Sequence, residues 1–168
     1  MYDTKSDNWT LKTNMPTARR GAAAVEINGK IYVIGGETSE SASSNANEVY
    51  NPSTNTWTTK KSMPVGLNAI SASVVNDKIY VFGGLTGSTQ RKTVYMYDAL
   101  SDTWTQKNDM PTAKIYMSTA VVNDMIYAVG GVSGSKFVPT VDMYNTNTDT
   151  WTTKAPMNTA RDGQVVLL

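Results

Sequence analysis

Short apolar stretches alternate with polar turn sequences along the whole chain, without the three-to-four-residue spacing of an amphipathic helix. Three apolar stretches rich in small residues lie at 21–27, 69–75 and 117–122. Each is followed by an Asn-Gly or Asn-Asp pair and then by a second apolar stretch that ends in Gly-Gly. Asn-led pairs tolerate positive φ at both positions of a two-residue turn, so each pair of stretches predicts a β-hairpin. We therefore predict an all-β chain.

Two further strands are expected in each unit. The third lies around 48–51, 94–98 and 141–145, and a turn rich in Asn, Asp, Ser, Thr and Pro leads to a fourth strand that carries Trp-Thr. A single four-stranded sheet cannot bury both of its faces. The units are therefore expected to stack as the blades of a propeller.

Three markers recur in the same phase, which identifies an internal repeat. The tryptophans are spaced by 48, 47 and 47 residues, and a tyrosine stands seven positions before each. The Gly-Gly pairs are spaced by 48 and 47 residues. The markers of the three full repeats are Gly35, Gly36, Tyr50 and Trp57; Gly83, Gly84, Tyr97 and Trp104; and Gly130, Gly131, Tyr144 and Trp151. Their strict recurrence favours packing and turn roles over ligand binding, with the Tyr and Trp rings filling the space between blades.

A strand ending in Gly-Gly, then a Tyr, six residues and a Trp, resembles the Kelch repeat over essentially the whole chain. IYVIGG, IYVFGG and IYAVGG, and the Met-Pro pairs at 15–16, 63–64 and 110–111, match this pattern. The resemblance implies a β-propeller in which the first strand of each blade lies nearest the axis. It also implies that the loops before the first strand and between the second and third strands share one face, the usual ligand surface of such proteins.

Counting strands against the markers predicts an incomplete ring. We expect three complete blades at 18–65, 66–112 and 113–159, the last strand of a partial blade at 1–17, and the first strand of another at 160–168. Residues 1–168 then form a single Kelch-repeat array. Three interpretations stay open: part of a longer array, a half-propeller that forms a homodimer, or an open stack of three blades.

Composition excludes several function classes. The sequence has no Cys and no His, which removes disulfides, thiolate and imidazole metal ligands, and the commonest catalytic bases. The net charge of +1 and the lack of a basic block disfavour nucleic acid as a partner, and no apolar run is long enough for membrane insertion by a helix. We expect neither a metal nor a cofactor. The Thr, Ser and Asn content is compatible with bacterial extracellular or cell-surface arrays, although the compartment stays open.

Candidate ligand-binding residues lie in the two sets of loops that the resemblance places on one face. The loops before the first strands supply cationic and amide groups suited to a carboxylate or an acidic peptide. The loops after Gly-Gly supply further residues that could anchor a ligand. The candidates are Arg19, Arg20, Asn68, Lys114, Tyr116, Arg161 and Asp162 from the first set, and Arg91, Lys136 and Phe137 from the second. The alternative for each is an ordinary solvated turn residue.

The Kelch resemblance implies a non-enzymatic module that recognises a protein or peptide, and these loop residues would form its binding surface. The alternative is a carbohydrate-active or sugar-binding propeller of the sialic acid mutarotase kind, with an arginine-lined mouth and Glu37 or Asp162 as acid–base candidates. The copper-oxidase branch of the family needs His ligands and a Cys-linked Tyr, and this sequence has neither residue type.

Overall fold

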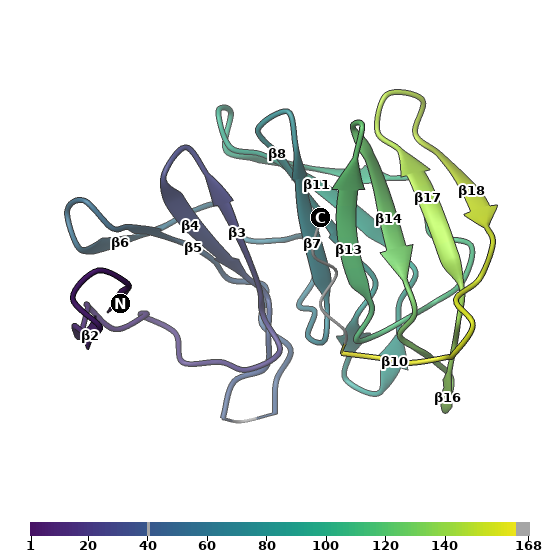
Figure 1. Ribbon diagram of the computed structural model, residues 1–168, viewed down its shortest axis with the longest axis horizontal. Helices are drawn as coiled ribbons and strands as arrows, with labels where there is room; N and C mark the ends of the chain where they lie inside the picture. Colours follow the sequence, from purple (N-terminus) through teal and green to yellow (C-terminus); the bar gives the residue numbers. More distant parts are fainter. Residues whose placement is uncertain (40, 164–168) are drawn as a thin grey trace.

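The computed structural model describes residues 1–39 and 41–163, in which every regular element is a β-strand. No helix in this part of the chain is long and apolar enough to span a bilayer. Three four-stranded antiparallel sheets make up the body of the molecule (Figure 1). The first blade contains β3 (Ala23–Ile27), β4 (Lys30–Ile34), β5 (Asn47–Asn51) and β6 (Thr56–Thr59).

The other two blades repeat this order. The central blade contains β7 (Ser71–Val75), β8 (Lys78–Phe82), β11 (Val94–Asp98) and β12 (Thr103–Lys107). The third blade contains β13 (Ser118–Val122), β14 (Met125–Val129), β17 (Val141–Asn145) and β18 (Thr150–Lys154). The predicted three-blade, all-β propeller segment is confirmed.

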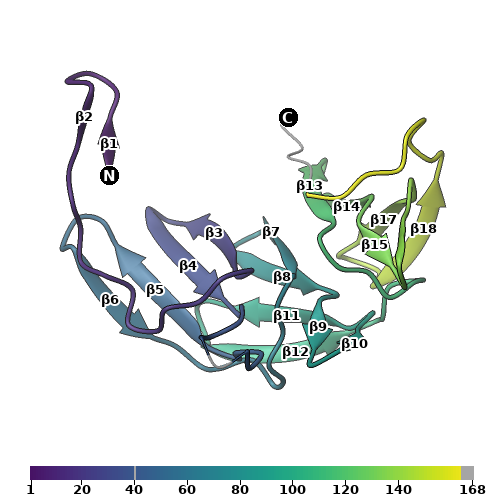
Figure 2. The same cartoon turned by 90° about the horizontal axis from the view of Figure 1, so that it is seen from below.

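The three blades fan out as an open arc rather than a closed ring (Figure 2). The first strands β3, β7 and β13 lie on its concave side, and β6, β12 and β18 lie on the outside. β7 contacts both β3 and β13, so the first strands of neighbouring blades lie side by side.

The N-terminal segment differs from the expected single last strand. β1 (Tyr2–Asp3) and β2 (Asn8–Trp9) form a hairpin, with Tyr2 opposite Trp9 as Tyr50 is opposite Trp57. Residues 1–17 therefore hold counterparts of both the third and the fourth strand. At the other end, residues 160–163 form no strand, and the rest of the expected strand at 160–168 lies outside the described residues.

The two-residue turns between the first and second strands have the expected left-handed backbone. Asn28 and Gly29 have φ of 51° and 74°, and the equivalent Asn-Asp pairs of the other blades also have positive φ at both positions. This geometry matches the twist of the flanking strands, which pair directly on either side of the turn.

The Gly-Gly pairs allow neighbouring blades to approach through their main chains. Gly36 N–H donates to Leu67 O (2.8 Å), and Gly84 N–H donates to Lys114 O (3.0 Å). Gly83 has φ of 61°, and a Cβ atom there would lie 2.3 Å from the Lys114 carbonyl oxygen. Any larger residue would push the next blade away.

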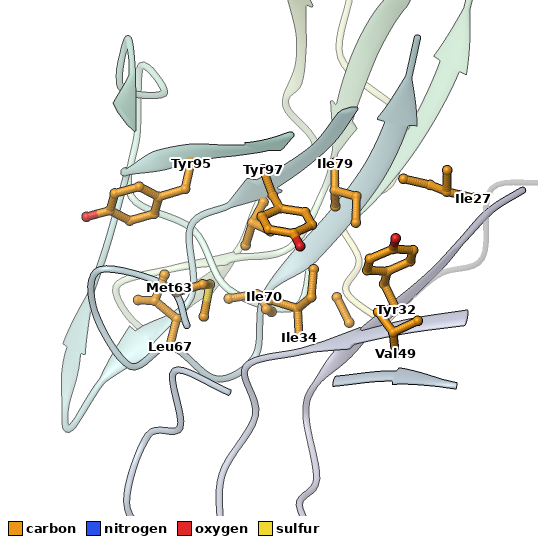
Figure 3. Close-up of a cluster of buried hydrophobic side chains, with 12 residues drawn as sticks. Ile27, Tyr32, Ile34, Val49, Met63, Leu67, Ile70, Ile79, Tyr95 and Tyr97 are labelled. Atoms are coloured by element: carbon orange, nitrogen blue, oxygen red, sulfur yellow. The ribbon is translucent and has the colours of Figure 1, made fainter. Parts of the chain in front are cut away.

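The core consists of two clusters, each filling the space between two blades. The first joins the first blade to the central one through side chains that include Tyr32, Ile34, Leu67 and Tyr97 (Figure 3). The second joins the central blade to the third. Met63 and Met110 are 2% and 1% exposed, so each of these two Met-Pro segments places its methionine in one of the clusters.

The tyrosine and tryptophan markers form a repeated joint. The Tyr97 ring packs against the Trp104 ring across the strand pair in a tilted arrangement, with ring centroids 4.9 Å apart. The Tyr97 hydroxyl donates to Asp102 Oδ1, which also accepts the Lys61 N–H, while the Trp104 indole N–H donates to Lys61 O. The first and third blades repeat the joint with Asn55 and Asp149. Tyr97 lies between blades as expected. Trp104 is only partly buried, and its indole N–H holds the segment around Lys61, which links the first blade to the central one.

Candidate functional site: the loop mouth

The loops before the first strands and the loops between the second and third strands lie together on one face of the propeller segment. In the central blade the latter loop folds into a small hairpin of β9 (Leu85–Thr86) and β10 (Thr89–Gln90). In the third blade it folds into β15 (Val132–Ser133) and β16 (Lys136–Phe137). β10 and β16 mark this face at the lower edge of Figure 1. We refer to this face as the mouth.

A ladder of main-chain hydrogen bonds runs across the mouth from blade to blade. Ala69 N–H donates to Gly21 O (3.0 Å), Tyr116 N–H to Ala69 O (3.1 Å), and Gly163 N–H to Tyr116 O (3.0 Å). All four residues have left-handed backbones, with φ between 53° and 62°. Gly adopts this conformation freely, but for a bulky residue such as Tyr116 it is strained. Residues held in such conformations cluster at functional sites.

A hollow of about 260 Å³ lies over this ladder. Gly21 and Ala69 belong to its lining, together with Arg20, Glu37, Asn68 and Tyr116. The Tyr116 residue is 48% exposed. The hollow therefore joins loops from all three blades around one aromatic and one charged group.

The charged group is an ion pair at the edge of the hollow. Arg20 Nε donates to Glu37 Oε2 at 2.8 Å, and the Arg20 side chain is 81% exposed whereas that of Glu37 is 22% exposed. The two residues also pair through their main chains. A second hollow of about 440 Å³ also borders this pair and is lined by Thr38, Ser39 and Ser41. Arg20 thus stands between two hollows with its side chain largely in solvent.

Two predicted mouth cations are instead buried inside their blades. The Arg19 guanidinium bonds to Glu48 and to the Val33 carbonyl, and Lys114 Nζ bonds to Asp142 Oδ2 at 2.7 Å. In both pairs the cationic side chain is fully buried and the carboxylate is 4% exposed. These two cations are part of the blade interior and do not face a ligand.

The remaining predicted residues occupy different environments. Asn68 is buried, with its amide donating to Ser43 Oγ. Arg91 bonds to Gly84 and Lys114 through its main chain, and its Nε atom is buried with no hydrogen-bond partner among the described residues. Phe137 is 60% exposed on the tip hairpin of the third blade, and Lys136 beside it is also exposed.

Arg161 and Asp162 follow the third blade and are both exposed. They directly precede the ladder residue Gly163. The main-chain oxygen of Arg161 accepts the Gly131 N–H at 2.9 Å.

Sequence reasoning missed the groups that hold the mouth loops together. The Gln90 side-chain amide links two neighbouring loop hairpins: its Nε2 donates to Gly134 O, and its Oε1 accepts the Gly134 N–H. Glu37, which the sequence suggested only as an acid–base candidate, is the ion-pair partner of Arg20. The repeat itself carries the missing signal: Arg19, Leu67 and Lys114 stand 16 residues before the first Gly of their pairs. An apolar residue at that position in one blade indicates that the position is buried in all of them.

The opposite face has a different character. It holds a hollow of about 410 Å³ between the first and central blades, lined by turn residues that include Lys30, Lys78 and Asp98. Lys78 is paired with Asp98 at 3.5 Å. Several groups with shifted pKa values belong to the turns and joints near this face. Burial raises the pKa of Tyr97, and its hydrogen bond to Asp102 raises it further. For Asp102, burial acts to raise the pKa, but bonds from Tyr97 and from the Lys61 N–H outweigh it and lower the pKa.

No group of three or more acidic side chains able to hold a metal ion occurs in residues 1–39 and 41–163. The mouth offers hydrogen-bond donors from Arg20, an acceptor from Glu37 and an aromatic surface from Tyr116. This set suits the reversible binding of a ligand with polar and apolar parts.

Comparison with known proteins was consistent with this architecture. A family model described as the KLHDC2/KLHL20/DRC7 Kelch-repeats domain matches residues 1–166. The F-box/kelch-repeat protein At1g67480 of Arabidopsis thaliana is 37% identical over 51 residues, which are 30% of this chain and 14% of that protein. A solved structure of YjhT superposes with a TM-score of 0.82 at 21% identity, covering 95% of this chain and 58% of that one. This chain is therefore shorter than both relatives.

Proposed function

Because this chain belongs to the Kelch-repeat family, we propose that it is a non-enzymatic interaction module that binds a protein or peptide partner through its mouth. One observation carries the proposal: the hollow over the main-chain ladder is bounded by exposed Arg20 and by Tyr116 in a strained backbone. The ladder requires this left-handed backbone in every blade, so the feature that supports ligand binding is the exposed ring that Tyr116 adds at a position where the other blades have Gly or Ala.

The chemistry of the chain agrees with binding rather than catalysis. The sequence has no His or Cys. Groups such as Tyr97 and Asp102, whose pKa values are shifted, take part in the repeated joints between blades and linkers. A structural role accounts for these shifts without an active site.

The test uses variants that copy the residues of neighbouring blades. Peptide ligands are selected on the full chain from a phage-displayed random 12-residue library, and bound clones are retested on Arg20→Asn and Tyr116→Gly. Asn occupies the Arg20 position in the central blade, and Gly occupies the Tyr116 position in the first blade, so both changes suit the local backbone. Leu100→Ser is the matched control, since Leu100 is 98% exposed and lines the hollow on the opposite face.

We expect the selected clones to lose about tenfold or more in affinity on the two mouth variants and to keep it on the control. Selection of no peptide, or equal loss on all three variants, would contradict the proposal.

A carbohydrate ligand is the second candidate, favoured by the Arg20–Glu37 pair between two hollows. Such a pair offers both donors and acceptors to a sugar acid. Proton NMR of N-acetylneuraminic acid would detect faster exchange between its anomers in the presence of the protein. Acceleration that Glu37→Gln abolishes would favour this candidate over a peptide.

A further Kelch-type blade is the proposed partner of the third blade. Val122 and Tyr127 occupy the repeat positions at which Ile27 and Tyr32 of the first blade pack on the central blade, and Val122 is 39% exposed. Sedimentation velocity distinguishes the source of that blade. A dimer mass indicates a second copy, a monomer mass is expected if the blade belongs to a longer array, and a monomer that binds no other Kelch array contradicts the proposal.

A further inference from the structure

The face opposite the mouth has a similar hollow at each of the two joints between blades. The first turn hollow, of about 410 Å³, lies between the first and central blades. The second turn hollow, of about 350 Å³, lies between the central and third blades. Both are lined by a lysine at the start of a second strand and by the tyrosine two residues later: Lys30 and Tyr32 in the first, Lys78 and Tyr80 in the second. The two hollows can therefore be compared residue by residue.

The lysine and the tyrosine of the second turn hollow already have partners. Lys78 Nζ lies 3.5 Å from Asp98 Oδ2, and the two residues are opposite each other on neighbouring strands. The Thr146 side chain hydrogen-bonds with the Tyr80 hydroxyl. Both groups are thus engaged within the fold.

Two repeat positions explain why the first turn hollow differs. Asn51 stands where the central blade has Asp98, so β5 offers Lys30 no carboxylate at this position. Ala99 stands where the third blade has Thr146, so the tyrosine of this hollow meets a methyl group instead of a hydroxyl. Each difference leaves one hydrogen-bond donor of the first blade without its partner.

The two donors left in this way border the same hollow. Lys30 and Tyr32 are two residues apart on β4, so their side chains lie on the same side of the strand. Within the described part of the chain, Lys30 forms no ion pair and the Tyr32 hydroxyl has no hydrogen-bond partner, although Tyr32 is only 5% exposed. Figure 3 shows this hydroxyl pointing away from Val49, toward the side of Ile27, which also lines the hollow. A buried donor without a partner is costly unless a ligand or water reaches it.

The central blade supplies a charge of the opposite sign. Asp77 is an exposed residue of the two-residue turn between β7 and β8, and it lines the same hollow. Lys78 and Asp98 line it too, but they neutralise each other. Of the described charged residues in the lining, this leaves Lys30 on one blade and Asp77 on the other without an ion-pair partner. A ligand with one charge of each sign matches both, whereas a multiply charged anion would be repelled by Asp77.

We propose that the first turn hollow binds a small zwitterion of the size of a dipeptide, with its carboxylate on Lys30 and Tyr32 and its ammonium group toward Asp77. Ligand sites in proteins have volumes of about 300–1,000 Å³, and this hollow is at the small end of that range. Ile27 and Ala99 give the ligand an apolar wall. The site lies on the face opposite the mouth and is independent of the function proposed there.

Three ligands derived from the dipeptide Gly-Leu test the two charges. They are the free dipeptide, its N-acetyl derivative, which lacks the ammonium group, and its C-terminal amide, which lacks the carboxylate. Their affinities for the full chain are measured by titration with saturation-transfer-difference NMR. We expect the free dipeptide to bind about tenfold more tightly than either derivative, because each derivative loses one charge-assisted contact.

Three variants assign the ends of the ligand. Lys30→Met and Tyr32→Phe, which keep the size of the side chain, should each remove most of the preference for the free dipeptide over its amide. Asp77→Asn should remove the preference over the N-acetyl derivative. Tyr80→Phe in the second turn hollow and Asp124→Asn in the equivalent turn of the third blade are the matched controls, and they should change none of the three affinities.

Two further variants block the site without removing any of its groups. Asn51→Asp copies the central blade and gives Lys30 a carboxylate, and Ala99→Thr copies the third blade and gives Tyr32 a hydroxyl partner. The neighbouring blades fold with these residues at the same positions, so the variants are expected to fold as well. Each should weaken binding of the free dipeptide severalfold.

Equal affinities for the free dipeptide and its two derivatives, or unchanged binding in Asn51→Asp and Ala99→Thr, would overturn the proposal. A loss of binding in Arg20→Asn would also do so, because it would place the dipeptide at the mouth. Absence of saturation transfer at about 10 mM dipeptide would have the same force, since a ligand with a dissociation constant of about 1 mM is mostly bound at that concentration.

Discussion

The central blade and the third blade solve one packing problem in two ways. At the position before the first strand, Lys114 of the third blade is buried against Asp142 on the third strand, while the central blade has Leu67 and Tyr95 at the same two places. Both backbones have the same strand order and the same Gly-Gly joint. The difference teaches that the repeat conserves its main-chain joints and leaves the buried pair free to be ionic or apolar.

The largest loss of stability is expected when one partner of the Lys114–Asp142 ion pair is removed. Lys114→Met should lower the free energy of unfolding by about 3–5 kcal/mol, because it leaves the Asp142 carboxylate buried without its cation. Chemical denaturation measures this loss. The double change Lys114→Leu with Asp142→Tyr copies the central blade and should recover most of it. A double variant as unstable as the single one would show that the two blades are not interchangeable here.

A smaller loss in the free energy of unfolding is expected from a change at the Gly-Gly joint, which the two blades share. Gly83→Ala should cost about 2–4 kcal/mol, since its Cβ would meet the Lys114 carbonyl at 2.3 Å in a left-handed backbone. Gly87→Ala is the matched control: its φ is 58°, but nothing lies within 4 Å of the added carbon. The control should cost about 1 kcal/mol. Equal losses in thermal or denaturant unfolding would mean that backbone conformation alone, and not blade contact, requires Gly83.

A still smaller loss of stability is expected from a change at the tryptophan joint. Trp104→Ala should cost about 2–3 kcal/mol, because the ring is partly buried against the first core cluster and donates to Lys61 O. Trp9 of the terminal hairpin is 80% exposed, so Trp9→Ala should have little effect on denaturant unfolding. A larger loss at Trp9 than at Trp104 would reverse the assignment of the packed joint.

The smallest effect concerns acid stability. The pKa of Asp102 is lowered in the folded protein, so its contribution is present above the ordinary Asp pKa of about 3.9 and is lost as the pH falls below that value. The first blade uses the uncharged Asn55 at the same place. Asp102→Asn should therefore lower the melting temperature slightly at pH 7 and reduce the further loss of melting temperature between pH 5 and pH 3, as measured by calorimetry. An unchanged acid profile would show that other carboxylates dominate it.

The sequence was sufficient for the parts of the fold that depend on local chemistry. Asn28 and Gly29 predicted their turn because few residues tolerate that backbone, and the Gly-Gly pairs predicted close approach. Arg19 and Arg20 show where it was insufficient. They are adjacent and chemically identical, yet one side chain is fully buried and the other is 81% exposed. The outcome depends on Glu48, which is 29 residues away and meets Arg19 only after the sheet has formed.

The hydrogen bonds of the mouth ladder all have the same sense: each blade donates an N–H to the carbonyl of the blade before it. Such a link works head to tail, like the bond between the units of a polymer, and it involves no side chain. Gly21, Ala69, Tyr116 and Gly163, which form it, are 48, 47 and 47 residues apart. A duplicated blade inserted in frame would meet the same main-chain N–H donor and carbonyl acceptor on the blades beside it. Gene duplication could thus lengthen the array or exchange its binding residues without a new interface having to evolve.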